Sequence, residues 1–191
     1  MPYFQRVFLI AFMVAYAFFE RQEIKHALAY LRLVMNQDDD TSLIRVVNFP
    51  ARGIGARTIE SLVDQAKTYN TTLAQAIARV AGKGGSSLAQ FATLIETMAQ
   101  ETRLLPLSEA VEHIIEASGL LHHYQGEKEG AERIENLGEL VNAATVFENE
   151  HDLSGLPSGQ PAKSLTELMP DDSVDELGLN TPIAQTPLSA F

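Results

Sequence analysis

Apolar residues recur at helical spacing along most of the chain, with polar residues at the positions between them. In the segment 18–36, a single apolar stripe consists of Ile24, Leu28, Leu31 and Met35. The same spacing predicts further helices over residues 40–47, 56–69, 73–80, 88–102, 108–118 and 130–147. No repeat is present, and no heptad pattern is long enough for a coiled coil. The pattern therefore predicts an all-α, multi-helix fold of about seven helices.

The breaks between these segments carry residues that typically begin or end helices. Asp38, Asp39 and Asp40 precede the helix over 40–47, where carboxylates accept hydrogen bonds from free amides. We interpret these aspartates as a cap and a solvated turn rather than a metal site, because spaced partner ligands are lacking. Residues 82–87 are rich in glycine and serine and predict a flexible loop. This segment lacks the order of residues found in nucleotide-binding loops.

Two later breaks are read in the same way. Ser108 is expected to cap the helix over 108–118, and Gly119 is expected to end it. His122 and His123 follow, and no carboxylate or third histidine lies at ligand spacing from them. We therefore interpret these two histidines as surface or packing residues rather than metal ligands.

One turn has a pattern with chemical meaning. The stretch Asn48-Phe-Pro-Ala-Arg-Gly-Ile-Gly-Ala-Arg-Thr-Ile-Glu60 joins the helices over 40–47 and 56–69. Glycines allow a ligand to approach the backbone closely, and the first amides of the second helix have no acceptor within that helix. A phosphate group satisfies such amides without contacting a base. Two arginines, at 52 and 57, and the hydroxyl of Thr58 flank the turn.

This turn is therefore a helix-hairpin-helix-like element. Its residues predict binding to the backbone of nucleic acid that is independent of base sequence. The alternative is a purely structural turn, because Gly-x-Gly between helices is also common as a helix C-cap. We expect Ile54 to pack beneath the turn.

Composition and charge narrow the possible functions. The chain has 191 residues, 46% of them hydrophobic, which is enough for one domain with a core. Its formal net charge of −11 argues against a protein that binds nucleic acid over its whole surface. The charge is uneven, however, since residues 41–70 carry four cations and two anions, whereas residues 148–178 carry one cation and eight anions. There is no cysteine, so a disulfide framework and a thiolate metal site are excluded.

The two ends of the chain differ from the helical middle. Val7 to Phe19 is nearly all apolar but is shorter than the roughly 20 residues that span a bilayer. It loosely imitates a secretory signal, and we interpret it as a segment that packs on other structure. Residues 149–191 are acidic and rich in proline, glycine and serine, with one possible helical turn at 165–169. The expected organisation is an atypical apolar segment over 1–17, a helical domain over 18–148, and a poorly structured, linker-like acidic tail over 149–191.

Three segments, in order, resemble motifs of the UvrD/Rep/PcrA helicases of superfamily 1. The first is Phe18-Phe-Glu-Arg-Gln-Glu-Ile-Lys-His-Ala-Leu-Ala-Tyr-Leu-Arg32, and the second is Arg45-Val-Val-Asn-Phe-Pro-Ala-Arg-Gly-Ile-Gly-Ala-Arg-Thr58. The third is Arg133-Ile-Glu-Asn-Leu-Gly-Glu-Leu140. The resemblance covers residues 18–147 well and the acidic tail poorly. Residues 9–17 depart from the family, and a glycine at 138 stands where a charged helix former is common.

The resemblance implies an accessory, regulatory subdomain, called 2B, of an ATP-dependent 3′–5′ DNA helicase that acts in repair or replication. Its implied partners are the backbone of double-stranded DNA, the motor subdomains of the parent helicase, and repair proteins, in the cytoplasm and without a membrane. By resemblance, the duplex contacts are Arg52, Gly53, Ile54, Gly55, Arg57 and Thr58. The segments 21–25 and 133–140 are expected to hold the subdomain together and to join it to the motor.

No cofactor is expected in this chain. The family's phosphate-binding motifs are missing from the sequence, so ATP and Mg²⁺ would bind to the parent helicase elsewhere, and this piece alone should not hydrolyse ATP. The competing interpretation is a helical protein–protein interaction module that does not bind DNA.

Overall fold

The computed structural model describes residues 18–151, and in these residues it contains helices and no strand. The helices are α2 (Gln22–Met35), α3 (Asp40–Val46), α4 (Ala56–Tyr69), α5 (Leu73–Ala76), the 3₁₀ helix η1 (Ile77–Arg79), α6 (Gly82–Glu101), α7 (Leu107–Ala117), α8 (Leu120–Gln125) and α9 (Gly130–His151). The predicted all-α class is confirmed. The predictions for residues 1–17 and for 152–191, including the helical turn at 165–169, lie outside the described residues.

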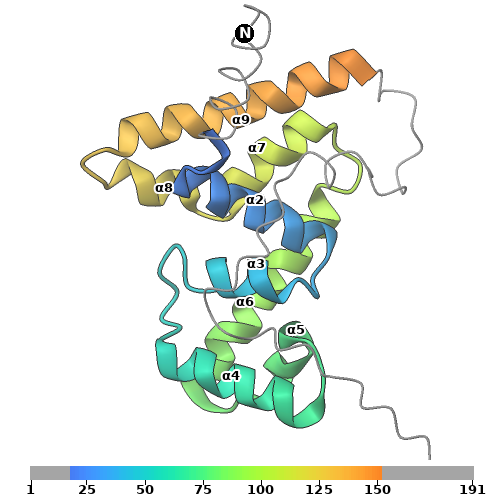
Figure 1. Ribbon diagram of the computed structural model, residues 1–191, viewed down its shortest axis with the longest axis vertical. Coiled ribbons are helices and arrows are strands. Elements are labelled where there is room, and N and C mark those ends of the chain that lie inside the picture. The colour runs from blue at the N-terminus through green and yellow to red at the C-terminus, as the bar shows by residue number, and fades with distance from the viewer. Residues whose placement is uncertain (1–17, 152–191) are drawn as a thin grey trace, which may run out of the picture. The chain divides into compact units, whose positions relative to one another are not determined.

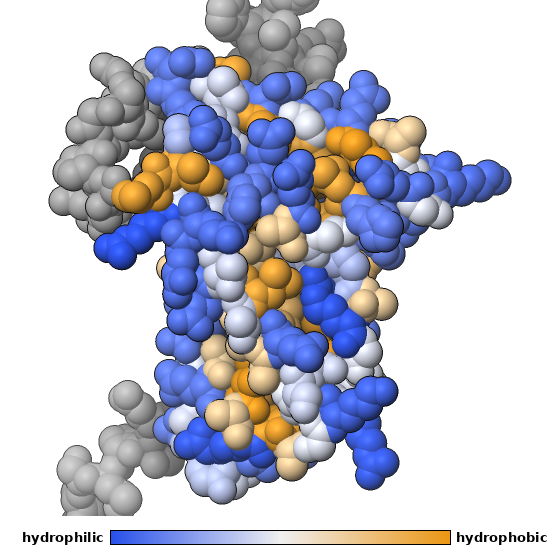
Figure 2. Space-filling view, turned by 180° about the vertical axis from the view of Figure 1, so that it is seen from behind, coloured by the Kyte–Doolittle hydropathy of each residue, from blue (hydrophilic) through white to orange (hydrophobic). Residues whose placement is uncertain are grey.

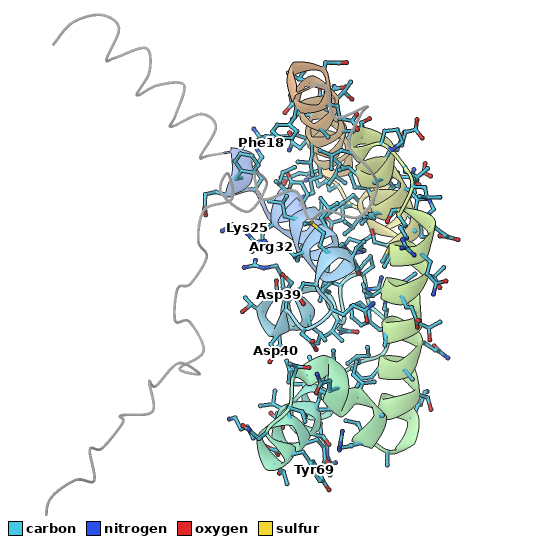
Figure 3. All side chains as sticks on the ribbon, turned by 90° about the vertical axis from the view of Figure 1, so that its right-hand side faces the viewer. Phe18, Lys25, Arg32, Asp39, Asp40 and Tyr69 are labelled. Carbon is cyan, nitrogen blue, oxygen red and sulfur yellow. The ribbon has the colours of Figure 1, made fainter. Side chains whose placement is uncertain are left out.

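Helix α6 is a long helix that packs against η1, α2 and α7 (Figure 1). Its first half packs against η1, near α4 and α5, and its second half leads to α7. Helix α2 packs against α3, α6, α7 and α9, while α7, α8 and α9 pack against one another. In the side view of Figure 3, Tyr69 at the end of α4 lies far from Phe18 at the start of the described chain. None of the helices within residues 18–151 is both long and apolar enough to cross a membrane.

The core shows why the predicted stripe of α2 was only half right. Ile24 and Leu28 are buried as expected, but Met35 is 54% exposed. The side chains of Tyr30 and Leu33 are buried instead. Because α2 has neighbours on several sides, it buries more than one stripe, and Met35 is its last residue.

Two helix starts depend on carboxylates, one predicted and one not. Asp39 caps α3 as expected, since its Oδ1 accepts from the amide of Ser42 at 3.0 Å. The expectation that Ser108 caps the next helix is wrong, because α7 begins at Leu107, with Pro106 at its N-cap position. Instead, Glu148 of α9 accepts hydrogen bonds from the amide of Leu107 and, at 2.7 Å, from the hydroxyl of Ser108. Gly119 follows α7 with φ +80°, the left-handed conformation expected of a residue that ends a helix.

The predicted flexible loop over 82–87 is wrong, because these residues form the first turns of α6. A Cβ added to Gly84 would lie 2.5 Å from Oγ1 of Thr58, and a Cβ on Gly85 would overlap the carbonyl oxygen of Val80. The glycines therefore allow close packing between α6, α4 and the chain before α6. Tertiary contacts override the low helix propensity of glycine at these positions.

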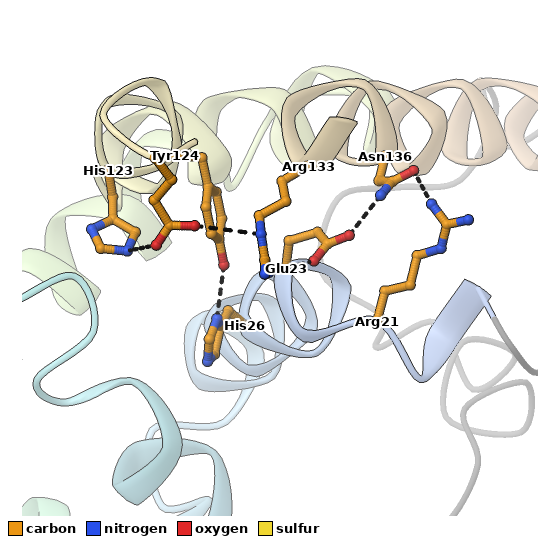
Figure 4. Close-up of polar contacts among 8 residues, drawn as sticks. Arg21, Glu23, His26, His123, Tyr124, Arg133 and Asn136 are labelled. Atoms are coloured by element: carbon orange, nitrogen blue, oxygen red, sulfur yellow. Dashed lines mark hydrogen bonds and ion pairs between the residues drawn. The ribbon is translucent and has the colours of Figure 1, made fainter. Parts of the chain in front are cut away.

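A polar network joins α2 to α8 and α9 (Figure 4). Glu23 is buried, and it accepts from Nη1 of Arg133 at 3.0 Å and from Nδ2 of Asn136 at 2.6 Å. Asn136 in turn accepts from Arg21, and His26 contacts the hydroxyl of Tyr124 at 3.0 Å. The expectation that segments 21–25 and 133–140 hold the domain together is confirmed by these contacts.

Candidate nucleic-acid interface

The turn between α3 and α4 is fastened by one amide side chain. Oδ1 of Asn48 accepts from the amide of Arg52 at 2.9 Å and from the amide of Ile54 at 3.0 Å. Gly53 lies between these two residues with φ +72°, a conformation that glycine adopts at little cost. The side chain of Ile54 is 0% exposed, so the expectation that it packs beneath the turn is confirmed.

The amides after this point are the candidate ligand donors. Gly55 is the N-cap of α4 and provides no side-chain cap, and its carbonyl accepts from Thr58 at 2.9 Å and from Ile59 at 3.2 Å. Within residues 18–151, the amides of Gly53, Gly55, Ala56 and Arg57 have no protein acceptor. A Cβ added to either glycine would meet no atom within 4 Å, so the surface above the turn is open.

The two arginines of the turn differ in orientation. Arg57 is exposed at the first turn of α4, and Thr58 beside it is half-buried. Arg52 instead donates to the carbonyl oxygen of Pro50 at 2.9 Å and to that of Ser118 at 2.7 Å. Its guanidinium carbon lies 5.7 Å from the ring centre of Tyr30 and 5.5 Å from that of Phe91. These contacts tie the turn to the residue that ends α7 and leave Arg52 half-buried.

The structure thus brings Gly53, Gly55 and Arg57 together at one open surface, while the side chain of Thr58 faces Gly84 of α6. The side chains of Ile54 and Arg52 are directed into the protein. Contact of these six residues with DNA stays a prediction.

An aromatic residue anchors the base of the turn. Phe49 stacks on His26 with ring centres 3.9 Å apart and meets His123 edge-on at 4.6 Å. The hydroxyl of Tyr30 donates to the carbonyl oxygen of Phe49 at 2.6 Å. Burial raises the pKa of Tyr30 to about 12, which keeps the phenol protonated and able to donate. The turn is therefore held by α2 and α8, and the interpretation of His123 as a packing residue agrees with this contact.

Two residues near the surface were missed by the sequence reasoning. The motif alone does not show the role of Asn48, although an asparagine in a turn often accepts hydrogen bonds from amides a few residues further along the chain. Lys83 was placed in a flexible loop, but it lies exposed in the first turn of α6, next to Gly84, which faces Thr58. Only the tertiary packing of α6 on α4 reveals that Lys83 lies near the turn.

Charge distinguishes the surroundings of the turn from the rest of the described chain. Residues 52–95, here called the hairpin lobe, contain five arginines and lysines and two acids, a net charge of +3. Residues 96–148 contain three cations and eleven acids, a net charge of −8. An anionic polymer is therefore attracted to the lobe and repelled by α7 to α9. The described residues bring together no group of three His, Asp or Glu that could hold a metal ion.

Comparison with known proteins gives one family. Residues 7–169 match the family described as the UvrD-like helicase C-terminal domain. DNA helicase II of Escherichia coli K12 is 45% identical over 149 residues, which cover 73% of this chain and 21% of that protein. DNA helicase II of Haemophilus influenzae is 44% identical over 138 residues, and ATP-dependent DNA helicase PcrA of Bacillus subtilis is 35% identical over 140 residues. The matches span about a fifth of the length of these relatives, between 19% and 21%.

Proposed function

The chain belongs to the family of UvrD-like helicase C-terminal domains, and from this membership we propose that its α3–α4 turn holds the sugar-phosphate backbone of duplex DNA. One observation carries the proposal. Four amides at the turn have no acceptor among residues 18–151, and the exposed Arg57 lies beside them. Such amides at a helix start bind phosphate oxygens through hydrogen bonds and the helix dipole.

The six predicted residues have different parts in this proposal. Gly53 and Gly55 offer amides where an added Cβ would meet no described atom within 4 Å, while Arg57 and Thr58 add a charge and a hydroxyl. Ile54 anchors the turn in the core, and Arg52 positions it through the carbonyl of Ser118. Contacts of this kind carry no base specificity, so binding is independent of DNA sequence.

The expected affinity is weak. Two exposed cations, Arg57 and Lys83, lie at the turn, and the acidic residues 96–148 oppose the approach of DNA. Neutralising about two phosphates predicts a slope near −2 for log K against log salt, with dissociation constants of roughly micromolar or weaker. Binding is therefore expected to be clear at low salt and to fade at moderate salt.

Within a longer protein, this chain would serve as the 2B subdomain of an ATP-dependent 3′–5′ DNA helicase. The motor subdomains would bind ATP and Mg²⁺ and would unwind DNA, while the α3–α4 turn contacts the duplex. Motor subdomains and repair proteins are then its protein partners. The support is the family match, together with relatives that are named DNA helicases.

A titration of fluorescent duplex DNA, followed by anisotropy at low and moderate salt, tests the proposal. Arg57→Ala is expected to weaken binding by about 3–10-fold and to reduce the salt slope by about one. Gly55→Ala is expected to weaken it too, since its Cβ meets no protein atom and φ is −82°, so only an approaching ligand is obstructed.

Lys128→Ala is the matched control. It also removes one exposed cation, but from the acidic region that follows α8. Wild-type affinity in both Arg57→Ala and Gly55→Ala would overturn the proposal. The absence of any duplex binding at low salt would favour the alternative, a helical protein-interaction module that does not bind DNA.

A further inference from the structure

Helix α4, which begins at the proposed DNA surface, is held at both ends by other parts of the chain. Its first turn follows the α3–α4 turn, which Asn48 and Arg52 fasten, and it meets α6 through Thr58. Along its length α4 packs mainly against α5 and η1, the two short helices that follow it. The direction of α4 therefore depends on the position of α5.

The start of α5 is held by two aspartates from the link between α2 and α3. Oδ1 of Asp40 accepts from the amide of Leu73 at 2.8 Å, and Oδ1 of Asp38 accepts from the hydroxyl of Thr72 at 2.6 Å. Asp38 also accepts a long hydrogen bond of 3.5 Å from Nε2 of Gln75. These three bonds are here called the aspartate contacts.

The adjacent aspartates of this link have different partners. Asp39 caps α3, which follows it directly, whereas Asp38 and Asp40 bond to residues 33 to 37 positions further along the chain. Figure 3 shows Asp39 and Asp40 between Arg32 of α2 and Tyr69 at the end of α4. The predicted cap and turn thus also joins the hairpin lobe to α2 and α3, and α5 packs against α3 at this place.

The aspartate contacts fix a direction that apolar packing does not fix. Figure 2, the view from behind, shows hydrophobic residues between hydrophilic ones along the middle of the molecule. Leu73 and Ala76 of α5 are buried, so part of its position comes from apolar contacts. Apolar attraction is not directional, whereas a hydrogen bond weakens steeply when it bends. Loss of the aspartate contacts would therefore allow α5 to tilt, and α4 with it, while both stay packed.

We propose that Asp38 and Asp40 are positioning residues for the DNA surface, because by fixing α5 they fix the direction in which the first amides of α4 point. This role rests on the function proposed above for the α3–α4 turn. The 14 residues of α4 span about 21 Å, and the aspartate contacts lie beyond the end of that helix. The two carboxylates thus act on DNA binding through α5 and α4 and not by touching DNA.

Two double variants separate this positioning from the effect of charge. Asp38→Ala/Asp40→Ala removes two negative charges and both acceptors, whereas Asp38→Asn/Asp40→Asn removes the same charges and keeps oxygens that accept hydrogen bonds. Charge alone would make both variants bind duplex DNA more tightly than wild type at low salt. Anisotropy titrations, made at a temperature well below every melting transition, measure the affinities.

We expect the asparagine variant to bind at least as tightly as wild type. The alanine variant is expected to bind about threefold or more weakly than the asparagine variant, because only a fraction of its molecules present the amides of α4 in the binding direction. A purely stabilising role of the aspartates would not change the affinity of the folded molecules.

Residual dipolar couplings of backbone amides in the 191-residue chain test the same role without DNA, because they report the angle between α4 and α2. The asparagine variant is expected to keep the wild-type couplings, and the alanine variant to change those of α4 relative to α2. Asp38→Ala alone, which removes only exposed hydrogen bonds, is expected to give a smaller change of the same kind. It replaces the double alanine variant if that protein does not fold.

Wild-type couplings in the alanine variant, or in Asp38→Ala where it is the one that folds, would overturn the positioning role. Equal DNA affinity of the alanine and asparagine variants would overturn it as well. If wild type itself does not bind the duplex, the function proposed for the turn fails, and the couplings still decide whether the aspartates fix the direction of α4.

Discussion

Asn48 and Arg52 determine the geometry of the α3–α4 turn through contacts that a short sequence motif does not contain. One oxygen of Asn48 accepts two amides, and the guanidinium of Arg52 reaches Ser118, which is 66 residues away in the sequence. The motif identified the glycines and the exposed Arg57, because their properties are local. It could not distinguish Arg52 from Arg57, because the partner of Arg52 is provided by a distant part of the chain.

Asn48→Ala is expected to lower the free energy of unfolding by about 1–3 kcal/mol, because it removes the acceptor of two amides at the turn. Urea denaturation followed by circular dichroism measures the change. Asn142→Ala is the control, since Asn142 is exposed on α9. The fastening role of Asn48 is contradicted if its variant is as stable as the Asn142 variant.

Two glycines predict opposite effects of the same substitution. Gly53 has φ +72°, so Gly53→Ala is expected to cost about 1–2 kcal/mol of stability. Gly138 lies exposed in the middle of α9, with nothing within 4 Å of an added Cβ. Gly138→Ala is therefore expected to add up to about 1 kcal/mol. Melting temperatures of the two variants should fall on either side of the wild-type value, and a shift of both in the same direction would contradict this explanation.

At the level of elements, the helices were predictable because their apolar spacing is a local property of the sequence. The start of α6 could not be predicted in this way. Its first turns have a glycine-rich sequence typical of a loop. They are helical in the structure, where the glycines allow close contact with Thr58 and Val80. The start of α7 was missed for a similar reason, since its capping carboxylate comes from Glu148 on α9. Both errors concern a helix start that is determined by another element.

The contact between α6 and α4 predicts a coupled pair of substitutions. Gly84→Ala should destabilise the wild-type protein, because the new Cβ would lie 2.5 Å from Oγ1 and 2.7 Å from Cγ2 of Thr58. In a Thr58→Ala background only the Cβ of residue 58 stays close, at 3.2 Å, so the same change should destabilise the protein much less. A double-mutant cycle is expected to give a coupling of about 0.5–2 kcal/mol. Additive effects would show that the two helix starts do not press against each other.

The link between α2 and α8 predicts a dependence of stability on pH. Burial, followed by the positive charge of Arg45, lowers the pKa of His26 from 6.5 to about 4. The unfolded chain then binds a proton that the folded chain does not, so stability is full above pH 6.5 and is lost as the pH falls towards 4. After allowance for solvent screening, the loss is on the order of 1–2 kcal/mol.

His26→Gln removes this titration and retains a group that can contact the hydroxyl of Tyr124. Unfolding free energies of both proteins, measured between pH 4 and pH 7, should therefore converge as the pH falls. The carboxylates titrate in both proteins, so the difference between the two curves isolates His26. A constant difference over this range would assign the stabilisation to packing against Phe49 rather than to the neutral imidazole.

For the molecule as a whole, the distribution of charge decides where an anionic polymer is attracted, and the net charge alone does not. The sequence predicted an uneven distribution, but it assigned the acidity mainly to residues 148–178, whereas residues 96–148 already carry a net charge of −8. Helices α7 to α9 contain most of these acids, and the hairpin lobe has a net charge of +3. An anionic polymer such as DNA would therefore be attracted to the hairpin lobe and repelled by α7 to α9.

Two double variants that remove the same charge separate local from long-range repulsion. Glu60→Gln/Asp64→Asn acts on the exposed face of α4, about 6–12 Å from the start of that helix at a rise of 1.5 Å per residue. Glu135→Gln/Glu139→Gln acts on α9. In about 0.01 M salt, with a Debye length near 30 Å, both variants should bind duplex DNA more tightly than wild type. At about 0.15 M, where that length is near 8 Å, only the α4 variant should retain an advantage, because the acids on α9 are then screened from DNA at the turn. An equal advantage of the α9 variant at the higher salt would indicate that DNA lies against α9 and not at the turn.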